Sequence, residues 1–266
     1  MEYKCRVKFS TKVSLVVCPV DDYTAVPKSG GNINVFLIEH PGRPVRKAGG
    51  YFVFTGLPPG TYHVVVQSDV YLNEIIEVAL EKVDPVEPIL FISLKPNSAY
   101  PFPAGSTLIR AALRGSEGNP APGAKIRATL MSVSCARAKT AQGGIKKGLQ
   151  EISLANVAGK IAVGDIFLIN DQEEVCSEYC RITGVLKETH KYLVAKPLRY
   201  DHKRGVLLLP VVETRADQRG EAVAYFRNIK EKNFDVKVEF SYENKIRIEE
   251  LKMTEGEVNY LGVIKI

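Results

Sequence analysis

The sequence lacks three features that would point directly to a cellular role. No stretch approaches the ~18 apolar residues that a membrane-spanning helix needs, and no apolar run of signal-peptide length follows Met1. Lys and Arg form no long run, and the formal charge of +6 is spread along the chain. We therefore expect no membrane insertion, cytoplasmic synthesis without a signal peptide, and no nucleic-acid partner.

Cysteine and histidine are also scarce. The five cysteines are an odd number scattered along the sequence, which argues against the disulfide framework of a secreted domain. None of the four histidines lies at metal-ligand spacing from another. We therefore expect neither a metal nor a cofactor.

Cys176 and Cys180 are the one closely spaced pair of thiols. A Cys-x3-Cys spacing without a second Cys or His pair is weak support for a metal site. In a single strand the two sulfur atoms would start about 13 Å apart on one face, too far apart for a disulfide. We interpret both as buried or half-buried thiols, and their role stays open.

One pattern of strands occurs twice in the chain. The matched positions are Phe54 with Phe226, Tyr62 with Phe234 and Leu94 with Ile266 at one offset, and Ile33 with Ile126 at a shorter offset. The difference between the two offsets leaves roughly 80 extra residues inside the second copy. Internal repetition of this kind predicts two related domains, the second of which carries an insertion.

Short runs of β-branched and aromatic residues fill both copies, separated by Gly, Pro, Asn or Asp at intervals of about ten residues. This is typical of antiparallel β-sandwiches rather than of alternating helices and strands. The proline-rich stretch 96–105 predicts an extended connector between the copies. We therefore predict an all-β chain of two tandem sandwiches, at 1–97 and at 98–133 with 212–266, and a small β-barrel or β-roll module at 134–211.

The segment Gly50–Val66 carries the clearest motif. Alternating aromatic residues precede a Pro58–Pro59–Gly60 turn, and Tyr62 then restarts the alternation on the returning strand. The segment resembles the transthyretin-like or carboxypeptidase-regulatory-like family of seven-stranded sandwiches. In the second copy the turn is replaced by Glu231–Lys232–Asn233. The resemblance implies a fold and says little about function.

Two enzyme families share that sandwich plan, and their functional residues do not match this chain. Hydroxyisourate hydrolases end in Tyr-Arg-Gly-Ser, whereas this sequence ends in Tyr260–Ile266. Intradiol dioxygenases hold iron with two Tyr and two His, whereas Tyr62 and His63 point to opposite faces of a strand. We therefore predict a non-enzymatic protein. An enzyme of another kind would need a concave pocket holding a perturbed histidine or carboxylate pair.

The insertion carries a second pattern, in three parts. Val163–Ile169 turns through Gly-Asp into an apolar strand, Glu178–Val185 is a second strand, and Tyr192–Val206 contains Pro-Leu and His202. This order is similar to that of a small β module in phage tail, baseplate and fibre proteins. The resemblance implies that His202 orients a loop by hydrogen bonding and does not act as a catalyst.

Together these resemblances imply a structural or attachment component of a phage-tail-like or contractile injection particle, such as a fibre, spike-extension or baseplate-associated subunit. Its partners would be other particle subunits or a second copy, joined through edge strands, and it would be assembled into a particle after cytoplasmic synthesis.

An alternative of a different class stays open. The chain would then be an adhesin-like module that binds a carbohydrate or a surface protein through its end loops. Tyr100, Phe102, Tyr192 and Tyr200 are the candidate aromatic platforms for such a ligand, and His202 would shape a nearby loop.

Overall fold

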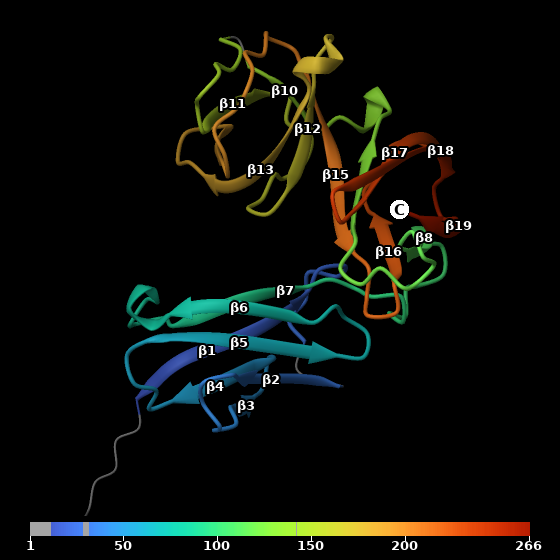
Figure 1. Cartoon of the computed structure of the whole chain (residues 1–266). Coiled ribbons are helices and arrows are strands. Elements are labelled where there is room, and N and C mark those ends of the chain that lie inside the picture. The colour runs from blue at the N-terminus through green and yellow to red at the C-terminus, as the bar shows by residue number, and fades with distance from the viewer. Residues whose placement is uncertain (1–11, 29–31, 142) are drawn as a thin grey trace, which may run out of the picture. The chain divides into compact units, whose positions relative to one another are not determined.

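The structure is a computed structural model that describes residues 12–28, 32–141 and 143–266. Its regular elements are strands and three short 3-10 turns (Figure 1), so the prediction of an all-β fold with tandem sandwiches is confirmed. The chain divides into two compact units, one ending at Pro101 and the other spanning Phe102–Ile266. No helix in the described ranges is long and apolar enough to cross a bilayer. The predicted thiol at Cys5 lies outside the described residues.

The first unit is a sandwich of two sheets. One sheet has the order β3 (Val45–Lys47), β4 (Tyr51–Thr55), β1 (Val13–Asp21) and β7 (Ile89–Leu94); the other has the order β2 (Ile33–Leu37), β5 (Thr61–Ser68) and β6 (Glu74–Ala79). Period-two alternation buries Phe52 and Phe54 on β4 and Tyr62 on β5. The Tyr62 hydroxyl donates to the carbonyl of Pro58 at 2.9 Å, which holds the turn between these strands.

The second sandwich repeats this plan. One sheet has the order β16 (Glu221–Phe226), β8 (Thr107–Arg114) and β19 (Val258–Lys265); the other contains β15 (Leu207–Arg215), β9 (Lys125–Leu130), β17 (Asn233–Tyr242) and β18 (Lys245–Thr254). In both units the first strand pairs in parallel with the last, β1 with β7 and β8 with β19. Phe226 on β16 and Phe234 on β17 lie in this core, as Phe54 and Tyr62 do in the other.

The insertion folds as a closed ring of six strands. The pairings run β10 (Ala138–Thr140), β11 (Glu151–Ala155), β14 (Lys191–Val194), β13 (Glu178–Val185), β12 (Ile166–Asn170) and β15, and β15 pairs back with β10. Inward-facing apolar side chains such as Phe167, Ile182 and Leu208 fill its interior. We call this ring the barrel.

Strand β15 belongs to both the barrel and the second sandwich. Its first residues, Leu207 and Leu208, pair with β10 and β12. Its last five, Val211–Arg215, pair with β9 of the sandwich. The expected boundary between residues 211 and 212 therefore falls within a continuous strand.

Candidate functional site

A pocket with a mixed polar and apolar lining opens at one rim of the barrel. It has a volume of about 420 Å³ and lies between the connection from β12 to β13 and the segment that leads into β15. Charged and amide side chains line it together with apolar groups: Asn170, Asp171, Gln172, Glu173, Cys176, Asp201, Lys203, Arg204, Gly205, Val206 and Leu207. We call it the rim pocket.

His202 lies behind the wall of the rim pocket and bridges two carboxylates. Its Nδ1 is 3.0 Å from Oδ2 of Asp171, and its Nε2 is 3.2 Å from Oε1 of Glu178. The His202 side chain is fully buried, and Glu178 is 4 % exposed. The two contacts engage both ring nitrogens of His202, so the ring joins the end of β12 to the start of β13.

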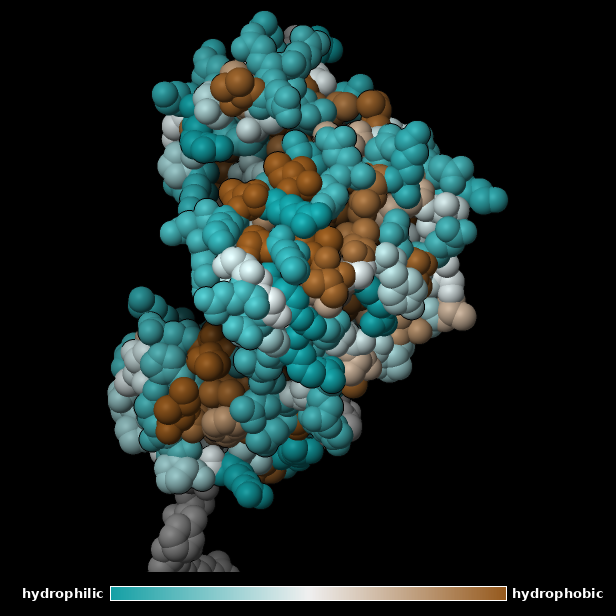
Figure 2. All heavy atoms as spheres, turned by 45° about the vertical axis from the view of Figure 1, so that its right-hand side comes forward, coloured by the Kyte–Doolittle hydropathy of each residue, from teal (hydrophilic) through white to brown (hydrophobic). Residues whose placement is uncertain are grey.

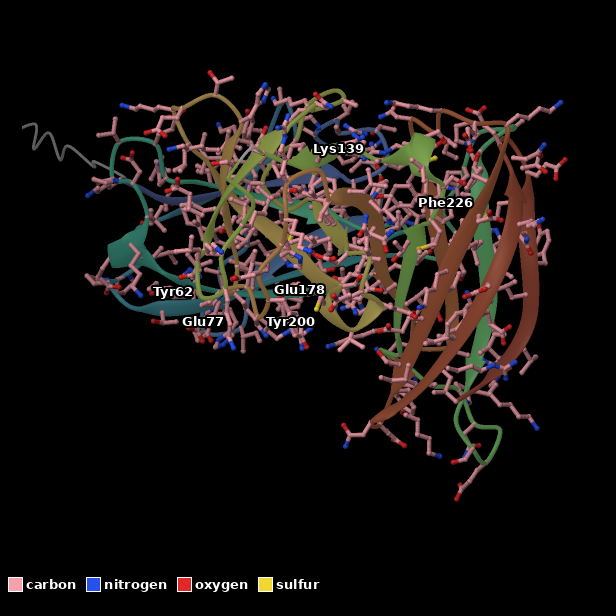
Figure 3. The ribbon with its side chains drawn as sticks, turned by 90° about the horizontal axis from the view of Figure 1, so that it is seen from above. Tyr62, Glu77, Lys139, Glu178, Tyr200 and Phe226 are labelled. Carbon is pink, nitrogen blue, oxygen red and sulfur yellow. The ribbon has the colours of Figure 1, made fainter. Side chains whose placement is uncertain are left out.

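Glu178 also fixes the backbone of the neighbouring loop. Its carboxylate accepts the backbone N–H groups of Arg199, at 2.9 and 3.0 Å, and of Tyr200, at 3.0 Å. Figure 3 shows Glu178 and Tyr200 side by side in the barrel. Because a buried carboxylate needs several donors, the loop and the start of β13 hold each other in place.

The backbone of His202 is fixed as well. Its N–H and C=O both bond to Ile145 at 2.8 Å. Gly144 has φ +64°, and a Cβ at that position would lie 2.4 Å from the His202 carbonyl oxygen. Only glycine fits so close an approach. Gly144 therefore allows the segment before β11 to pack directly against the backbone of the His202 loop.

The negative charge of Asp171 is favoured by these contacts. Burial works against ionisation of Asp171, but hydrogen bonds from His202 and from the backbone of Glu173 and Gln172 outweigh it and lower its pKa. Asp171 therefore stays a carboxylate on the inner wall of the pocket. Both ring nitrogens of the buried His202 are engaged with carboxylates, so its ring joins the loop before β15 to the ends of β12 and β13.

The two candidate thiols lie in different environments. Cys176 ends the 3-10 turn η3 (Glu174–Cys176) at the pocket, whereas Cys180 lies in β13 and faces the barrel core. The two are therefore not on one strand, and the spacing estimated for a single strand does not apply. Both are free, as are the buried Cys18 and Cys135.

Neither thiol is set up as a nucleophile. The Cys176 sulfur lies 3.7 Å from Oε2 of Glu173, and its pKa is raised by desolvation and by the charges of Glu173 and Asp171. Burial, together with the charge of Glu178, raises the pKa of Cys180 to about 12. Reactive cysteines need the opposite surroundings, with positive charge nearby.

The four candidate aromatic platforms do not form one surface. Tyr192 is 5 % exposed inside the barrel, and Tyr100 is 8 % exposed, so neither ring offers a face to a ligand. Phe102 is half-buried against Tyr225, with ring centroids 5.9 Å apart. Tyr200 is half-buried beside the Arg199 guanidinium, which lies 5.6 Å from the ring centroid.

Tyr100 instead belongs to a buried polar cluster of the first unit. Its hydroxyl donates to Asp21 at 2.7 Å, and the Tyr71 hydroxyl donates to the same carboxylate oxygen at 2.9 Å. Lys28 Nζ lies 3.2 Å from that oxygen. Burial opposes ionisation of Asp21, yet these hydrogen bonds and the backbone N–H of Thr24 lower its pKa. The cluster anchors the start of the connector.

Sequence reasoning missed the partners of His202. Asp171 follows β12 and Glu178 begins β13, and nothing in their spacing from His202 reveals the contact. The one available signal is that Glu178 shares a strand face with the apolar Cys180 and Ile182, two and four residues on. Among the described residues, no three His, Cys, Asp or Glu side chains lie close enough together to hold a metal ion.

No family model and no curated protein matches the sequence. Three similar solved structures are pilin subunits. A streptococcal ancillary pilin is 11% identical with a TM-score of 0.23, over 96% of this chain and 69% of that one. BcpA, the major pilin subunit of Bacillus cereus, is 11% identical with a TM-score of 0.24, over 94% and 69%. The shaft pilin SpaA from Lactobacillus rhamnosus GG is 8% identical with a TM-score of 0.23, over 95% and 97%.

These matches correct the resemblances stated from the sequence. The similar structures are pilins, neither transthyretin-like proteins nor phage-tail modules, so the prediction of a phage-tail-like or contractile injection component is wrong. The patterns that suggested it, a Gly-Asp turn into an apolar strand and a Pro-Leu strand end, describe local strand and turn geometry that unrelated β proteins share. At such identities and TM-scores the likeness itself carries no functional conclusion.

Proposed function

We propose that the chain is a non-enzymatic, adhesin-like attachment module that binds a carbohydrate or a surface protein at the rim pocket of the barrel. The observation that carries the proposal is a concave pocket that presents charged and amide side chains beside apolar groups, with a wall fixed by the buried bridge from Asp171 through His202 to Glu178. A pre-ordered wall lowers the entropy lost when a ligand binds.

The chemistry of the lining favours a polar ligand. Asn170 and Gln172 supply amide donors and acceptors, Asp201 supplies a carboxylate, and Lys203 and Arg204 supply positive charge. No aromatic ring lines the pocket. Recognition would therefore depend on hydrogen bonds and charge, as suits sugar hydroxyl and carboxylate groups or the polar side chains of a protein loop.

The connection of the barrel to its sandwich supports the same function. Because β15 continues from the barrel into the sheet that contains β9, no flexible linker separates the pocket from the scaffold. Loops that carry binding residues on a rigid scaffold are the usual arrangement in recognition proteins. The second sandwich would act as the scaffold that presents the barrel.

The test is binding of the full chain to a glycan array and to intact cells. Lys203→Ala combined with Arg204→Ala should weaken binding at least about tenfold, since charged hydrogen bonds contribute roughly 1.5–3 kcal/mol each. Lys187→Ala is the matched control, because Lys187 is exposed on the same barrel but does not line the pocket. Equal binding by both variants, or no binding by the wild type, would reject the proposal.

A further inference from the structure

The second sandwich has a long unpaired edge at β18. This strand is ten residues long and, within the described part of the chain, pairs only with β17. An edge of this length presents a row of backbone N–H and C=O groups to any strand that can lie beside it.

The turn before β18 defines which residues face the open edge. Glu243 and Asn244 have φ of +46° and +65°, the pattern of a two-residue type I′ hairpin, so Tyr242 and Lys245 form its hydrogen-bonded closing pair. At the far end of the hairpin the Glu255 N–H bonds to the Lys232 carbonyl at 2.7 Å. Glu255 lies ten residues after Lys245, so this bond fits the same alternation of bonded and non-bonded pairs. Between these pairs, every second residue of β18 points its backbone N–H and C=O groups outward. These residues are Ile246, Ile248, Glu250, Lys252 and Thr254.

The side chains of β18 differ between its two faces. On one face Ile246 is 65 % exposed and Ile248 is 50 % exposed. On the opposite face Arg247 Nε bonds to Oε1 of Glu249 at 2.8 Å. Figure 2 brings forward the side of this unit that carries β18 and β19, and patches of apolar side chains interrupt its polar surface. The open edge therefore combines exposed isoleucines with an exposed ion pair.

We propose that two copies of this chain associate through β18, antiparallel and with the two-fold axis at Ile248. In this register Ile248 faces Ile248 of the second copy, and their edge-facing backbone groups form a hydrogen-bonded pair. Arg247 then lies opposite Glu249 of the second copy, and Glu249 opposite Arg247. The exposed Ile246 and Ile248 side chains of the two copies join into one apolar strip.

The charges of β18 favour the two-fold axis at Ile248 over an axis at a nearby residue. An axis at Glu249 or at Glu250 would place two glutamates directly opposite each other, and an axis at Arg247 would do the same with two arginines. An axis at Leu251 avoids like charges by pairing Glu250 with Lys252, but it leaves Ile246 beyond the paired segment. Only the axis at Ile248 both pairs opposite charges and covers the isoleucines.

The same ion pair makes a second copy the preferred occupant. Charged residues on an edge strand disfavour pairing with a neutral strand, because their charges would lose water without gaining a partner. In the proposed register a second copy brings the complementary charge to Arg247 and to Glu249, and Glu250 lies opposite Ile246. The paired segment is short, so the dimer should be weak and dependent on concentration. This inference is independent of the rim pocket.

The test is sedimentation equilibrium of the full chain from micromolar to millimolar concentration. We expect a monomer–dimer equilibrium in the wild type. Arg247→Glu should raise the dissociation constant at least about tenfold, as should Glu249→Arg, because each places like charges opposite each other. Arg247→Glu combined with Glu249→Arg should restore the wild-type value. Thermal melts of each variant establish that the fold is intact.

Two further variants identify the register. Glu250→Lys should leave the dimer intact if the axis is at Ile248, whereas it would disrupt a dimer centred at Leu251. Ile248→Cys, in a Cys176→Ser background, should form a disulfide-linked dimer on mild oxidation, since Cα atoms in such a pair lie about 5.5 Å apart. A wild type that stays monomeric at millimolar concentration, or a charge swap that fails to restore association, would overturn the proposal.

Discussion

His202 Nε2 lies 3.2 Å from Oε1 of Glu178, and both side chains are almost completely buried beneath the rim of the barrel. A buried carboxylate such as that of Glu178 is tolerated only when it has hydrogen-bond partners. This pair joins the loop that precedes β15 to the first residue of β13. The contact between His202 and Glu178 therefore holds the wall of the rim pocket in place.

Replacing His202 with Ala should destabilise the barrel strongly. The substitution leaves Asp171 and Glu178 as buried carboxylates without their shared partner, which costs about 3–5 kcal/mol. Urea denaturation followed by circular dichroism measures the loss. His190→Asn is the matched control, since His190 is exposed and its left-handed φ of +60° suits Asn. A loss below about 1 kcal/mol for His202→Ala would show that the bridge does not hold the rim.

Gly144→Ala should be more harmful than Gly148→Ala. Both glycines have positive φ, +64° and +84°, so both variants carry backbone strain of roughly 1 kcal/mol. Only at position 144 would the new Cβ collide with a backbone oxygen, that of His202, whereas position 148 has open space. We expect a further loss of about 1–3 kcal/mol at 144. Equal unfolding free energies for the two variants would contradict the close approach.

Acid should remove the stabilisation that Asp21 provides. Its pKa is lowered in the folded state from the ordinary value of 3.8, so the ionised form is favoured by folding. The contribution is fully present above about pH 4 and is lost as pH falls through the lower, folded pKa. The stability gap between wild type and Asp21→Asn should therefore shrink below pH 4. A gap that stays constant between pH 2 and pH 6 would show that the charge of Asp21 is not stabilising.

Thiol labelling should separate Cys176 from Cys180. At pH 8 a maleimide should modify Cys176 in the native state, slowly because its pKa is raised by desolvation and nearby carboxylates. Cys180 is buried and its pKa is raised to about 12, so it should react only after the barrel opens. Peptide mass spectrometry with and without urea assigns each site. Native-state labelling of Cys180 at the rate of Cys176 would contradict its place in the core.

The tandem sandwiches could be predicted from the sequence because period-two alternation is a local property. Phe54 and Phe226 occupy the same position in β4 and β16, and the repeat aligned them before any contact was known. The same alternation could have shown that Tyr192 and Val194 share the inner face of β14. Tyr192 is therefore an inward-facing core residue and not an exposed platform.

The contacts around His202 depend on how distant strands pair with one another, so they could not be predicted from a local pattern. Asp171, Glu178 and His202 meet because β12 pairs antiparallel with β13 and a separate loop folds back over that end. No local pattern in the sequence encodes a contact between three such separated residues. The path of β15 could not be predicted for a related reason: Leu207–Arg215 contains Pro210, yet it is one strand that pairs with different neighbours along its length.

The continuity of β15 has a mechanical consequence. A load applied at the barrel would travel along this strand and stretch its hydrogen bonds with β9 in shear, without first extending a linker. The barrel and its sandwich should then yield together, as a single event in a force–extension trace. Joining β9 directly to β16 to remove the insertion would also remove a strand of the sandwich sheet, so the barrel cannot be cut out as a separate cassette.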